Sequence, residues 1–271
     1  MSIDACAELV KSGDPDRYLS VMAAPVGARD RLFVLYAFNL EVARAPWASK
    51  EEMIAEMRLQ WWLDTINEIY KGNVRHHEVV APLAEMIAKY NLPQALFIEI
   101  IEARRFDIYR ESHSGMSAFD AYINATSGNL MRLAVMSLGA KDLDCVANFG
   151  YGVGIANLWR ALPALYAAGR HPVPVTCALD RNAVAGGRVP ENLSDALREI
   201  STSALSKVQA ARKLRAQIPK PAVPAMLSGW QVSVPLTMVK VQPQNTLVQP
   251  LETSEFQKRL ALLWRSSTSL W

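Results

Sequence analysis

Four polar side chains stand in stretches of sequence that are otherwise apolar, and they are the first candidates for chemistry. Glu41 and Arg44 belong to one such stretch, and Asn157 and Arg160 belong to another. A charge among apolar residues is costly unless it is paired or meets a ligand. Glu41 is therefore either a polar group of a pocket, paired with Arg44 or Arg160, or one half of a structural ion pair.

Arg160 is a candidate for binding an anion. A guanidinium in the middle of an apolar helix can hold an anionic ligand through charge-assisted hydrogen bonds. The competing interpretation is an arginine that protein partners satisfy. The amides of Asn129 and Asn157 are of a type that more often joins packed helices than binds a ligand.

Two further clusters favour structure over chemistry. Adjacent histidines such as His76 and His77 point apart on a helix, so we expect no shared metal ion. The glycines at 150, 152 and 154 resemble part of a nucleotide-binding loop, but no strand precedes them. Close packing of helices is the better interpretation of these glycines.

One charged cluster and two tryptophans complete the candidates. Asp107 follows Arg104 and Arg105, and this spacing favours a salt bridge on a solvated face. Trp264 is expected to pack, with an anchor for a partner protein as the alternative. The sequence assigns no role to Trp271.

Composition narrows the class of protein. The 271 residues are 51% apolar and 20% charged, with a formal net charge of +3. So small a surplus does not predict nucleic-acid binding, although it would tolerate peripheral contact with an anionic membrane. Residues 1–16 lack the pattern of a signal or transit peptide, and no apolar run is long enough to span a bilayer. We expect a cytoplasmic protein, with the inner membrane as a possible site of peripheral contact.

The cysteines are three, scattered and odd in number: Cys6, Cys145 and Cys177. No CxxC pair or Cys/His cluster occurs, so neither a zinc site nor a disulfide framework is expected. A reducing compartment fits this usage best.

Helical periodicity dominates the chain and predicts one all-α domain, a helical bundle over residues 1–271. Pro172 and Pro174 force an extended stretch, and residues 241–254 have no clear period, so this segment is expected to be a loop followed by a short helix and a tail. The predicted helices span 30–45, 50–70, 76–90, 93–109, 118–138, 142–165, 192–217, 223–240 and 256–264.

Three ordered segments carry a resemblance to a known family. They are residues 31–39 (RLFVLYAFN), 119–129 (FDAYINATSGN) and 150–160 (GYGVGIANLWR). Their order and separation resemble the squalene/phytoene synthase family, over about residues 17–175 and more loosely beyond. The resemblance implies the isoprenoid synthase fold.

The resemblance also implies where a metal site should be. Enzymes of this family join two prenyl diphosphates head to head, and aspartates on two facing helices hold the magnesium that neutralises the diphosphates. The five aligned positions carry other residues here: Ala43, Arg44, Trp47, Ala161 and Leu165.

Loss of every aligned aspartate favours a protein without the family's catalysis. The pattern YAFN followed by MRLQW at 57–61 is similar to a branch of the family that includes the mitochondrial complex I assembly factor related to phytoene synthases. We therefore expect an assembly factor for respiratory complex I or a binder of an isoprenoid-like lipid. We expect no metal and no cofactor.

Two alternatives remain open at this stage. The first is an active prenyl-diphosphate synthase of the phytoene or squalene type, a magnesium-dependent transferase with ligands relocated to residues such as Glu41, Asp64, Asp107 or Asp120. The second is a purely structural interaction protein with a collapsed pocket.

The expected ligand is an isoprenoid-like lipid or a prenyl diphosphate, and the expected macromolecular partner is a protein of respiratory complex assembly. The residues expected to bind the ligand are Tyr36, Glu41, Arg44, Asn129, Asn157 and Arg160.

Overall fold

Helices follow one another along the whole chain in the computed structural model, which describes residues 3–49, 51–109, 112–175, 179–251, 253–268 and 270–271. No strand occurs among these residues, so the predicted all-α bundle is confirmed. The α-helices are α1 (Ile3–Gly13), α2 (Pro15–Met22), α3 (Val26–Arg44), α4 (Glu52–Ile69), α5 (Val80–Tyr90), α6 (Gln94–Ala103), α7 (Phe106–Tyr109), α8 (Met116–Ile123), α9 (Asn129–Ser137), α10 (Asp144–Ala167), α11 (Arg181–Ala185), α12 (Glu191–Lys213), α13 (Val223–Met226), α14 (Ser233–Val241) and α15 (Glu255–Thr268).

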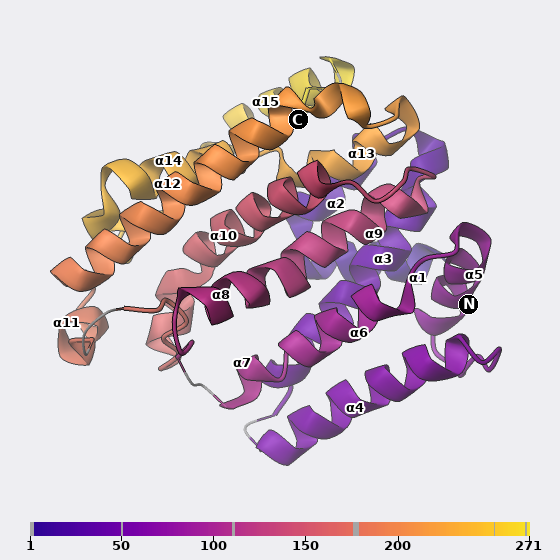
Figure 1. Cartoon of the computed structure of the whole chain (residues 1–271), viewed down its shortest axis with the longest axis horizontal. Coiled ribbons are helices and arrows are strands. Elements are labelled where there is room, and N and C mark those ends of the chain that lie inside the picture. The colour runs from indigo at the N-terminus through magenta and orange to yellow at the C-terminus, as the bar shows by residue number, and fades with distance from the viewer. Residues whose placement is uncertain (1–2, 50, 110–111, 176–178, 252, 269) are drawn as a thin grey trace.

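Helix α10 forms the centre of the bundle, as its all-round apolar surface predicts. It packs against α9, α12 and α14, and Figure 1 shows it running between α8 and α12. Helix α3 contacts α1, α2, α5 and α9 on the N-terminal side, while α4 packs on α6 at the lower edge of Figure 1. These contacts place the two helices that carry the aligned positions, α3 and α10, within one core.

The glycines of α10 let it approach its neighbours closely. A Cβ atom at Gly150 would lie 2.8 Å from Cβ of Met131 and 2.9 Å from the carbonyl oxygen of Ser127. A Cβ atom at Gly154 would lie 2.7 Å from Cβ of Ser127, which is closer than side chains tolerate. The expectation of close helix packing at these glycines is therefore met by the structure.

A π-helical turn interrupts the predicted helix 118–138. Residues Asn124–Gly128 (η2) adopt the wider turn between α8 and α9, and the helix begins at Met116 after Gly115. Such turns occur often at functional sites. The sequence pattern did not reveal it, because the apolar spacing continues across the turn.

Several predicted boundaries were wrong. Turns at 104–105 split the predicted helix 93–109, and a 3₁₀ turn with the residues after it separates 223–240 into α13 and α14. The 3₁₀ turn at this split is η5 (Leu227–Gly229). A separate 3₁₀ turn, η1 (Ala45–Trp47), follows α3 directly. The predicted helix at 76–90 begins only at Val80, and the sequence analysis assigned no helix to α1, α2 or α11.

The two C-terminal tryptophans differ in burial. Trp264 was expected to pack, but 64% of it is exposed, whereas Trp271 is buried against Phe149 with ring centroids 4.6 Å apart.

Cys6 and Cys145 are buried free thiols, and Cys177 lies outside the described residues. Among the helices of the described residues, none combines the length and apolarity needed to cross a bilayer.

Candidate functional site

A cavity of about 310 Å³ opens beside the second half of α10. Its walls come from the end of α3, from η1, from α7, from the π-helical turn and from residues 170–172 after α10. We call it the central cavity. Its apolar lining includes Phe106, Ile123, Leu130, Leu158 and Leu165, and its polar lining includes Arg17, Asn39, Arg104, Asp107, Tyr122, Asn157 and Arg170. An open cavity of this size argues against the collapsed pocket that the sequence left possible.

Four of the five positions aligned with the family's aspartates line this cavity: Ala43, Trp47, Ala161 and Leu165. Arg44 does not. Its side chain is exposed on the outside of α3, where its guanidinium covers Gly13. The face that would hold metal in the family's pattern therefore offers methyl groups, an isobutyl group and an indole.

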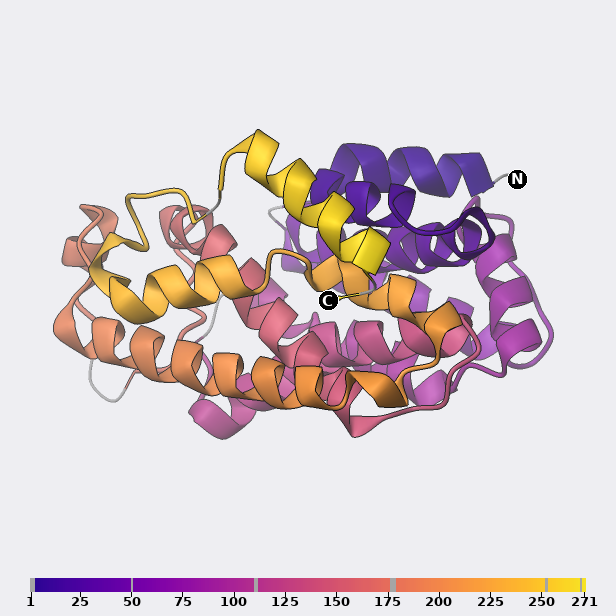
Figure 2. The ribbon, with the colours of Figure 1, turned by 90° about the horizontal axis from the view of Figure 1, so that it is seen from above.

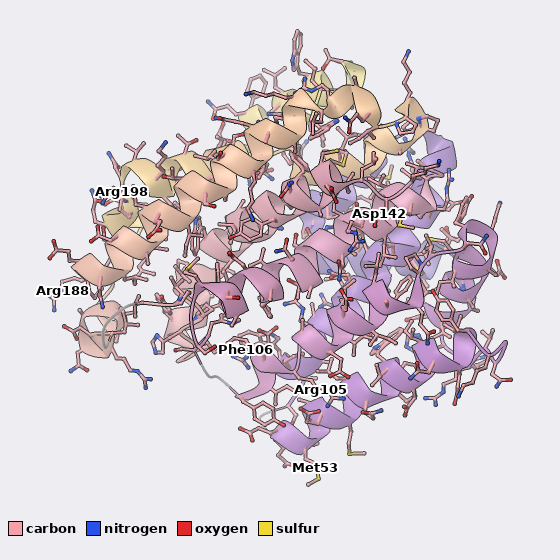
Figure 3. The ribbon with its side chains drawn as sticks, viewed as in Figure 1. Met53, Arg105, Phe106, Asp142, Arg188 and Arg198 are labelled. Carbon is pink, nitrogen blue, oxygen red and sulfur yellow. The ribbon has the colours of Figure 1, made fainter. Side chains whose placement is uncertain are left out.

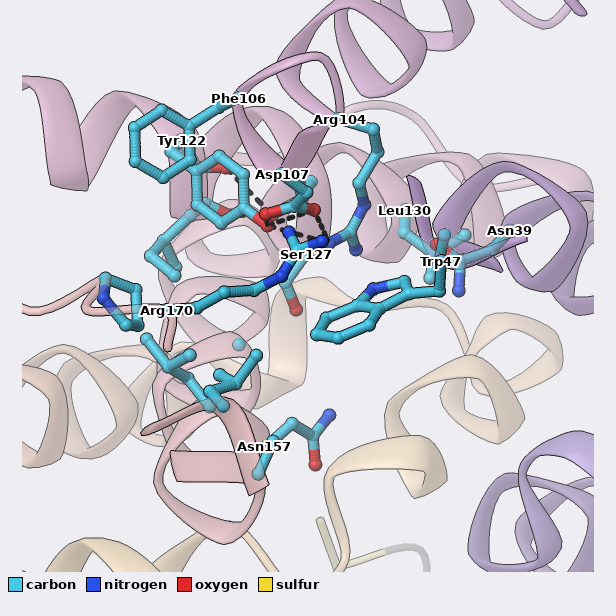
Figure 4. Close-up of a pocket in the computed structure, with 18 of the residues that line it drawn as sticks. Asn39, Trp47, Arg104, Phe106, Asp107, Tyr122, Ser127, Leu130, Asn157 and Arg170 are labelled. Atoms are coloured by element: carbon cyan, nitrogen blue, oxygen red, sulfur yellow. Dashed lines mark hydrogen bonds and ion pairs between the residues drawn. The ribbon is translucent and has the colours of Figure 1, made fainter. Parts of the chain in front are cut away.

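A hydrogen-bonded network of three side chains forms one wall of the cavity (Figure 4). Nη1 of Arg104 donates to Oδ2 of Asp107 at 3.1 Å and to the hydroxyl of Tyr122 at 2.7 Å. The Tyr122 hydroxyl donates to Asp107, with an oxygen–oxygen distance of 2.9 Å. Burial is the main cause that raises the pKa of Tyr122, so this hydroxyl keeps its proton. The expected salt bridge at Asp107 is present, with Arg104, but it lines the cavity and does not lie on a solvated face.

Two further arginines bring positive charge to the cavity. The guanidinium carbon of Arg170 lies 3.9 Å from the ring centroid of Trp47, a cation–π contact that joins η1 to the segment after α10. Arg17 forms an ion pair with Asp14, with Nη1 and Oδ2 3.2 Å apart, and its guanidinium lies 4.9 Å from the ring of Tyr36.

A buried histidine packs beside the network, against Phe106 and Tyr122. His113 stacks on Phe106, with ring centroids 3.8 Å apart and planes 12° apart. Burial lowers the pKa of His113 to about 4, with Asp107 opposing the shift. The imidazole is therefore neutral at neutral pH and adds no charge to the site.

The lining does not fit a magnesium cluster. Asp107 is the one carboxylate among the lining residues that the structure describes, and Arg104 and Tyr122 already occupy it. Nowhere in the described part of the chain do three His, Cys, Asp or Glu side chains gather as a metal site. Magnesium held by several carboxylates is therefore incompatible with this wall.

The relocated ligands considered for an active enzyme are not brought together. Asp64 accepts a hydrogen bond from Gln60, and Asp120 accepts one from the hydroxyl of Tyr151 at 2.6 Å. Neither of these carboxylates lines the central cavity, and Glu41 does not line it either.

The structure separates the six residues expected to bind a ligand. Asn157 lines the central cavity and also a smaller pocket beside it. Arg160 faces the smaller pocket, where its Nη2 lies 2.5 Å from Oδ2 of Asp16. Glu41 lines neither of these pockets, and Arg160 pairs with Asp16. The pairing considered for Glu41 stays a prediction.

The remaining two candidates are buried away from the cavity lining. Tyr36 lies under the guanidinium of Arg17, and Asn129 donates to Glu99 at 2.6 Å and accepts from Arg132. Their proposed role in binding stays a prediction.

Sequence reasoning missed most of the charged lining. Arg17 carried no signal in its local sequence, because it does not stand in an apolar helical stripe. Arg104 was predicted to lie near Asp107, but on a solvated face of the protein and not in a cavity.

The geometry defines an all-α protein with a cavity beside its central helix and an arginine-rich wall. The sequence model of the squalene/phytoene synthase family matches residues 10–250. The chain therefore belongs to the squalene/phytoene synthase family.

Individual relatives divide between assembly factors and enzymes. The Bos taurus protein named NADH dehydrogenase (ubiquinone) complex I, assembly factor 6 is 27% identical over 260 residues, which cover 90% of this chain and 78% of that protein. A phytoene synthase from Rhodobacter capsulatus is 22% identical over 181 residues, 64% of this chain and 52% of that enzyme.

The crystal structure of squalene synthase HpnC from Alicyclobacillus acidocaldarius has the same fold. Its TM-score is 0.77 at 18% identity, with 89% of this chain and 93% of that chain covered. A likeness at this level of identity shows the fold alone.

Proposed function

We propose that this protein is a non-catalytic member of the squalene/phytoene synthase family that acts in the assembly of respiratory complex I. The observation that carries the proposal is the central cavity, whose aligned positions hold Ala43, Trp47, Ala161 and Leu165 in place of aspartates. The similarity to the bovine assembly factor over most of the chain supports the same function.

Deletion of the gene in its own organism tests this function. We expect the mature complex I band on a native gel to be lost and NADH-driven respiration to fall, while the other respiratory complexes persist. Expression of the wild-type chain from a plasmid should restore both. Normal complex I levels in the deletion strain would contradict the proposal.

We further propose that the central cavity binds an isoprenoid-like anionic lipid, or a prenyl diphosphate, without metal. Arg17, Arg104 and Arg170 supply guanidinium groups that can hold phosphate or carboxylate oxygens directly. The apolar lining, which includes Leu130 and Leu158, supplies the environment that a hydrocarbon chain requires.

Calorimetry with a non-hydrolysable prenyl diphosphate analogue tests this ligand. We expect binding that survives a chelator and weakens with salt. Arg104→Gln and Arg170→Gln should weaken it by about tenfold or more, since a hydrogen bond to a charged group contributes roughly 1.5–3 kcal/mol. Arg105→Gln is the matched control, because Arg105 does not line the cavity and instead pairs with Glu56 and Glu102.

An active prenyl-diphosphate synthase remains the second candidate. The observation in its favour is the similarity to the Rhodobacter capsulatus phytoene synthase. Incubation of the pure protein with farnesyl or geranylgeranyl diphosphate and magnesium separates the two candidates. Release of diphosphate together with a longer hydrocarbon would establish the enzyme and end the non-catalytic proposal.

The place of action is also part of this proposal. A cytoplasmic protein with peripheral contact at the inner membrane fits the assembly of a membrane complex. Fractionation of cells tests it: the chain should divide between the soluble fraction and a membrane fraction that releases it on washing with carbonate.

A further inference from the structure

The last long helix presents an apolar face to solvent. Phe256, Leu260, Leu263 and Trp264 of α15 are 75%, 56%, 65% and 64% exposed. Their spacing of three and four residues puts them on one side of the helix. We call these four side chains the α15 apolar face. Single exposed apolar residues are common, but four large ones on one helical face mark a contact surface.

The opposite side of α15 holds the helix on the bundle. Lys258 and Leu262 are its buried residues, and the helix rests mainly on η5. Figure 2 shows α15 lying on the outside of the bundle, above the other C-terminal helices in that view. The α15 apolar face is therefore directed away from the protein core and has room for a large partner.

The C-terminal part of the chain, which contains α15, differs from the rest in its net charge. Residues 200–271 contain nine Lys and Arg against two Asp and Glu, whereas residues 1–199 contain 20 against 24. No acidic residue occurs from 200 to 251. The small net charge of the whole protein thus conceals a strongly basic C-terminal quarter.

Part of this positive charge gathers beside α15. Arg212 and Arg215, at the end of α12 and just after it, lie near Arg265 of α15. Burial lowers the pKa of Arg212 to about 10, and repulsion from Arg265 and Arg215 adds to the effect. Lys213, next to Arg212 in the sequence, and Arg259 of α15 are exposed. We call these five residues the basic end.

We propose that the α15 apolar face and the basic end together dock on the surface of an anionic lipid bilayer. An amphipathic helix that combines Phe, Leu and Trp with nearby Lys and Arg has the composition of an interfacial helix. Its aromatic rings enter the boundary between headgroups and acyl chains, while the exposed cations Lys213 and Arg259 meet the lipid phosphates. An acidic protein surface would complement the positive charge, but it would not account for four large exposed apolar side chains on one helical face.

This inference specifies the surface for the peripheral membrane contact proposed above. It rests on that contact and not on the role in complex I assembly, so the two can fail separately. Loss of vesicle binding with normal complex I would remove only the docking surface.

Co-sedimentation with vesicles tests the docking surface. We expect the wild-type chain to bind vesicles of phosphatidylcholine mixed with phosphatidylglycerol, and to bind pure phosphatidylcholine much more weakly. The double variant Phe256→Ser, Trp264→Ser should lose roughly tenfold or more in binding, because two aromatic anchors no longer enter the bilayer. The charge variant Lys213→Gln, Arg259→Gln should bind anionic vesicles less well and show a smaller effect of salt.

A matched control comes from the far side of the molecule. Met53 and Met57 of α4 are 74% and 66% exposed, and Met53 points away from the bundle in Figure 3. The variant Met53→Ser, Met57→Ser should therefore bind vesicles as the wild type does. Circular dichroism checks that all three variants fold.

Two results would overturn the proposal. The first is equal vesicle binding by the wild type and the Phe256→Ser, Trp264→Ser variant. The second is a wild-type dimer that this variant converts to a monomer during sedimentation without lipid, which would assign the α15 apolar face to a second copy of the chain.

Discussion

The two halves of α10 differ sharply although they belong to one continuous helix. In the first half, Gly150 and Gly154 bring the backbone so close to the α8–α9 segment that a methyl group would clash. In the second half, Asn157, Ala161 and Leu165 face the central cavity. The first half is close-packed, and the second leaves room for a ligand.

This difference shows how a fold can be kept while its chemistry is replaced. Packing at the glycines depends on shape, and a change there affects the whole bundle. The cavity wall depends on charge, and substitution of carboxylates by Ala161 and Leu165 leaves the helix itself intact. Two structural features of the cavity half, the network around Arg104 and the stack on Phe106, give ways to test this contrast.

The largest effect is expected in the glycine half. Gly150→Val should lower the free energy of unfolding by about 3 kcal/mol or more, because the backbone carbonyl of Ser127 cannot move away from the new side chain. Ala161→Val, on the same helix, should cost about 0.5 kcal/mol or less, since its new methyl groups enter the cavity. Urea unfolding of both variants measures the difference, and equal losses would break the comparison.

The next effect depends on pH. His113 has a pKa of about 4 in the folded chain and about 6.5 when unfolded. Between these values the unfolded chain binds a proton that the folded chain does not. Stability should therefore be fully present above pH of about 6.5 and fall by up to roughly 3 kcal/mol as the pH drops towards 4.

His113→Phe gives the control for this pH effect. Phenylalanine keeps the stacking on Phe106 but cannot bind a proton. Urea unfolding at neutral and acidic pH should show a smaller loss of stability in the variant. An unchanged pH dependence would show that other groups cause the effect.

A smaller effect is expected from the network at the cavity wall. Asp107→Ala should lower the free energy of unfolding by roughly 2 kcal/mol, because it leaves the half-buried Arg104 and Tyr122 without their acceptor. Asp142→Ala breaks a more exposed pair with Arg132 and should cost less than about 1 kcal/mol. Equal losses in the two variants would mean that the cavity wall behaves like open surface.

The smallest effect concerns the contact that spans the cavity. Trp47→Leu removes the ring under Arg170 and should cost roughly 0.5–1 kcal/mol. Trp47→Phe keeps an aromatic ring and should recover part of this loss. Thermal unfolding measures both variants, and a loss in Trp47→Phe as large as in Trp47→Leu would show that the cation–π contact contributes nothing.

Much of the fold could be predicted from the sequence. The apolar spacing of α3, α4, α10 and α12 gave helices in the right places, and the three glycines of α10 indicated close packing. These features depend on residues near one another in the chain. The π-helical turn at Asn124–Gly128 and the break after Ala103 could not be predicted, because they arise where one helix must fit against others.

The candidate site was predicted only in part. The positions at 43, 47, 161 and 165, which the family's pattern fixes along the chain, line the cavity. The arginines do not follow the sequence prediction. Arg44 lies outside the cavity and Arg160 pairs with Asp16, while Arg17 and Arg170 reach the cavity lining.

The sequence by itself determined that this protein is helical, that it shares the family's segments and that it lacks the family's aspartates. Only the tertiary structure decided which cations face the central cavity and which apolar residues of α15 stay in solvent. The physical reason is that a helical period fixes the direction of a side chain relative to its own helix. Whether that direction meets the core, a cavity or water depends on how separate helices pack, and residues distant in the chain control that packing.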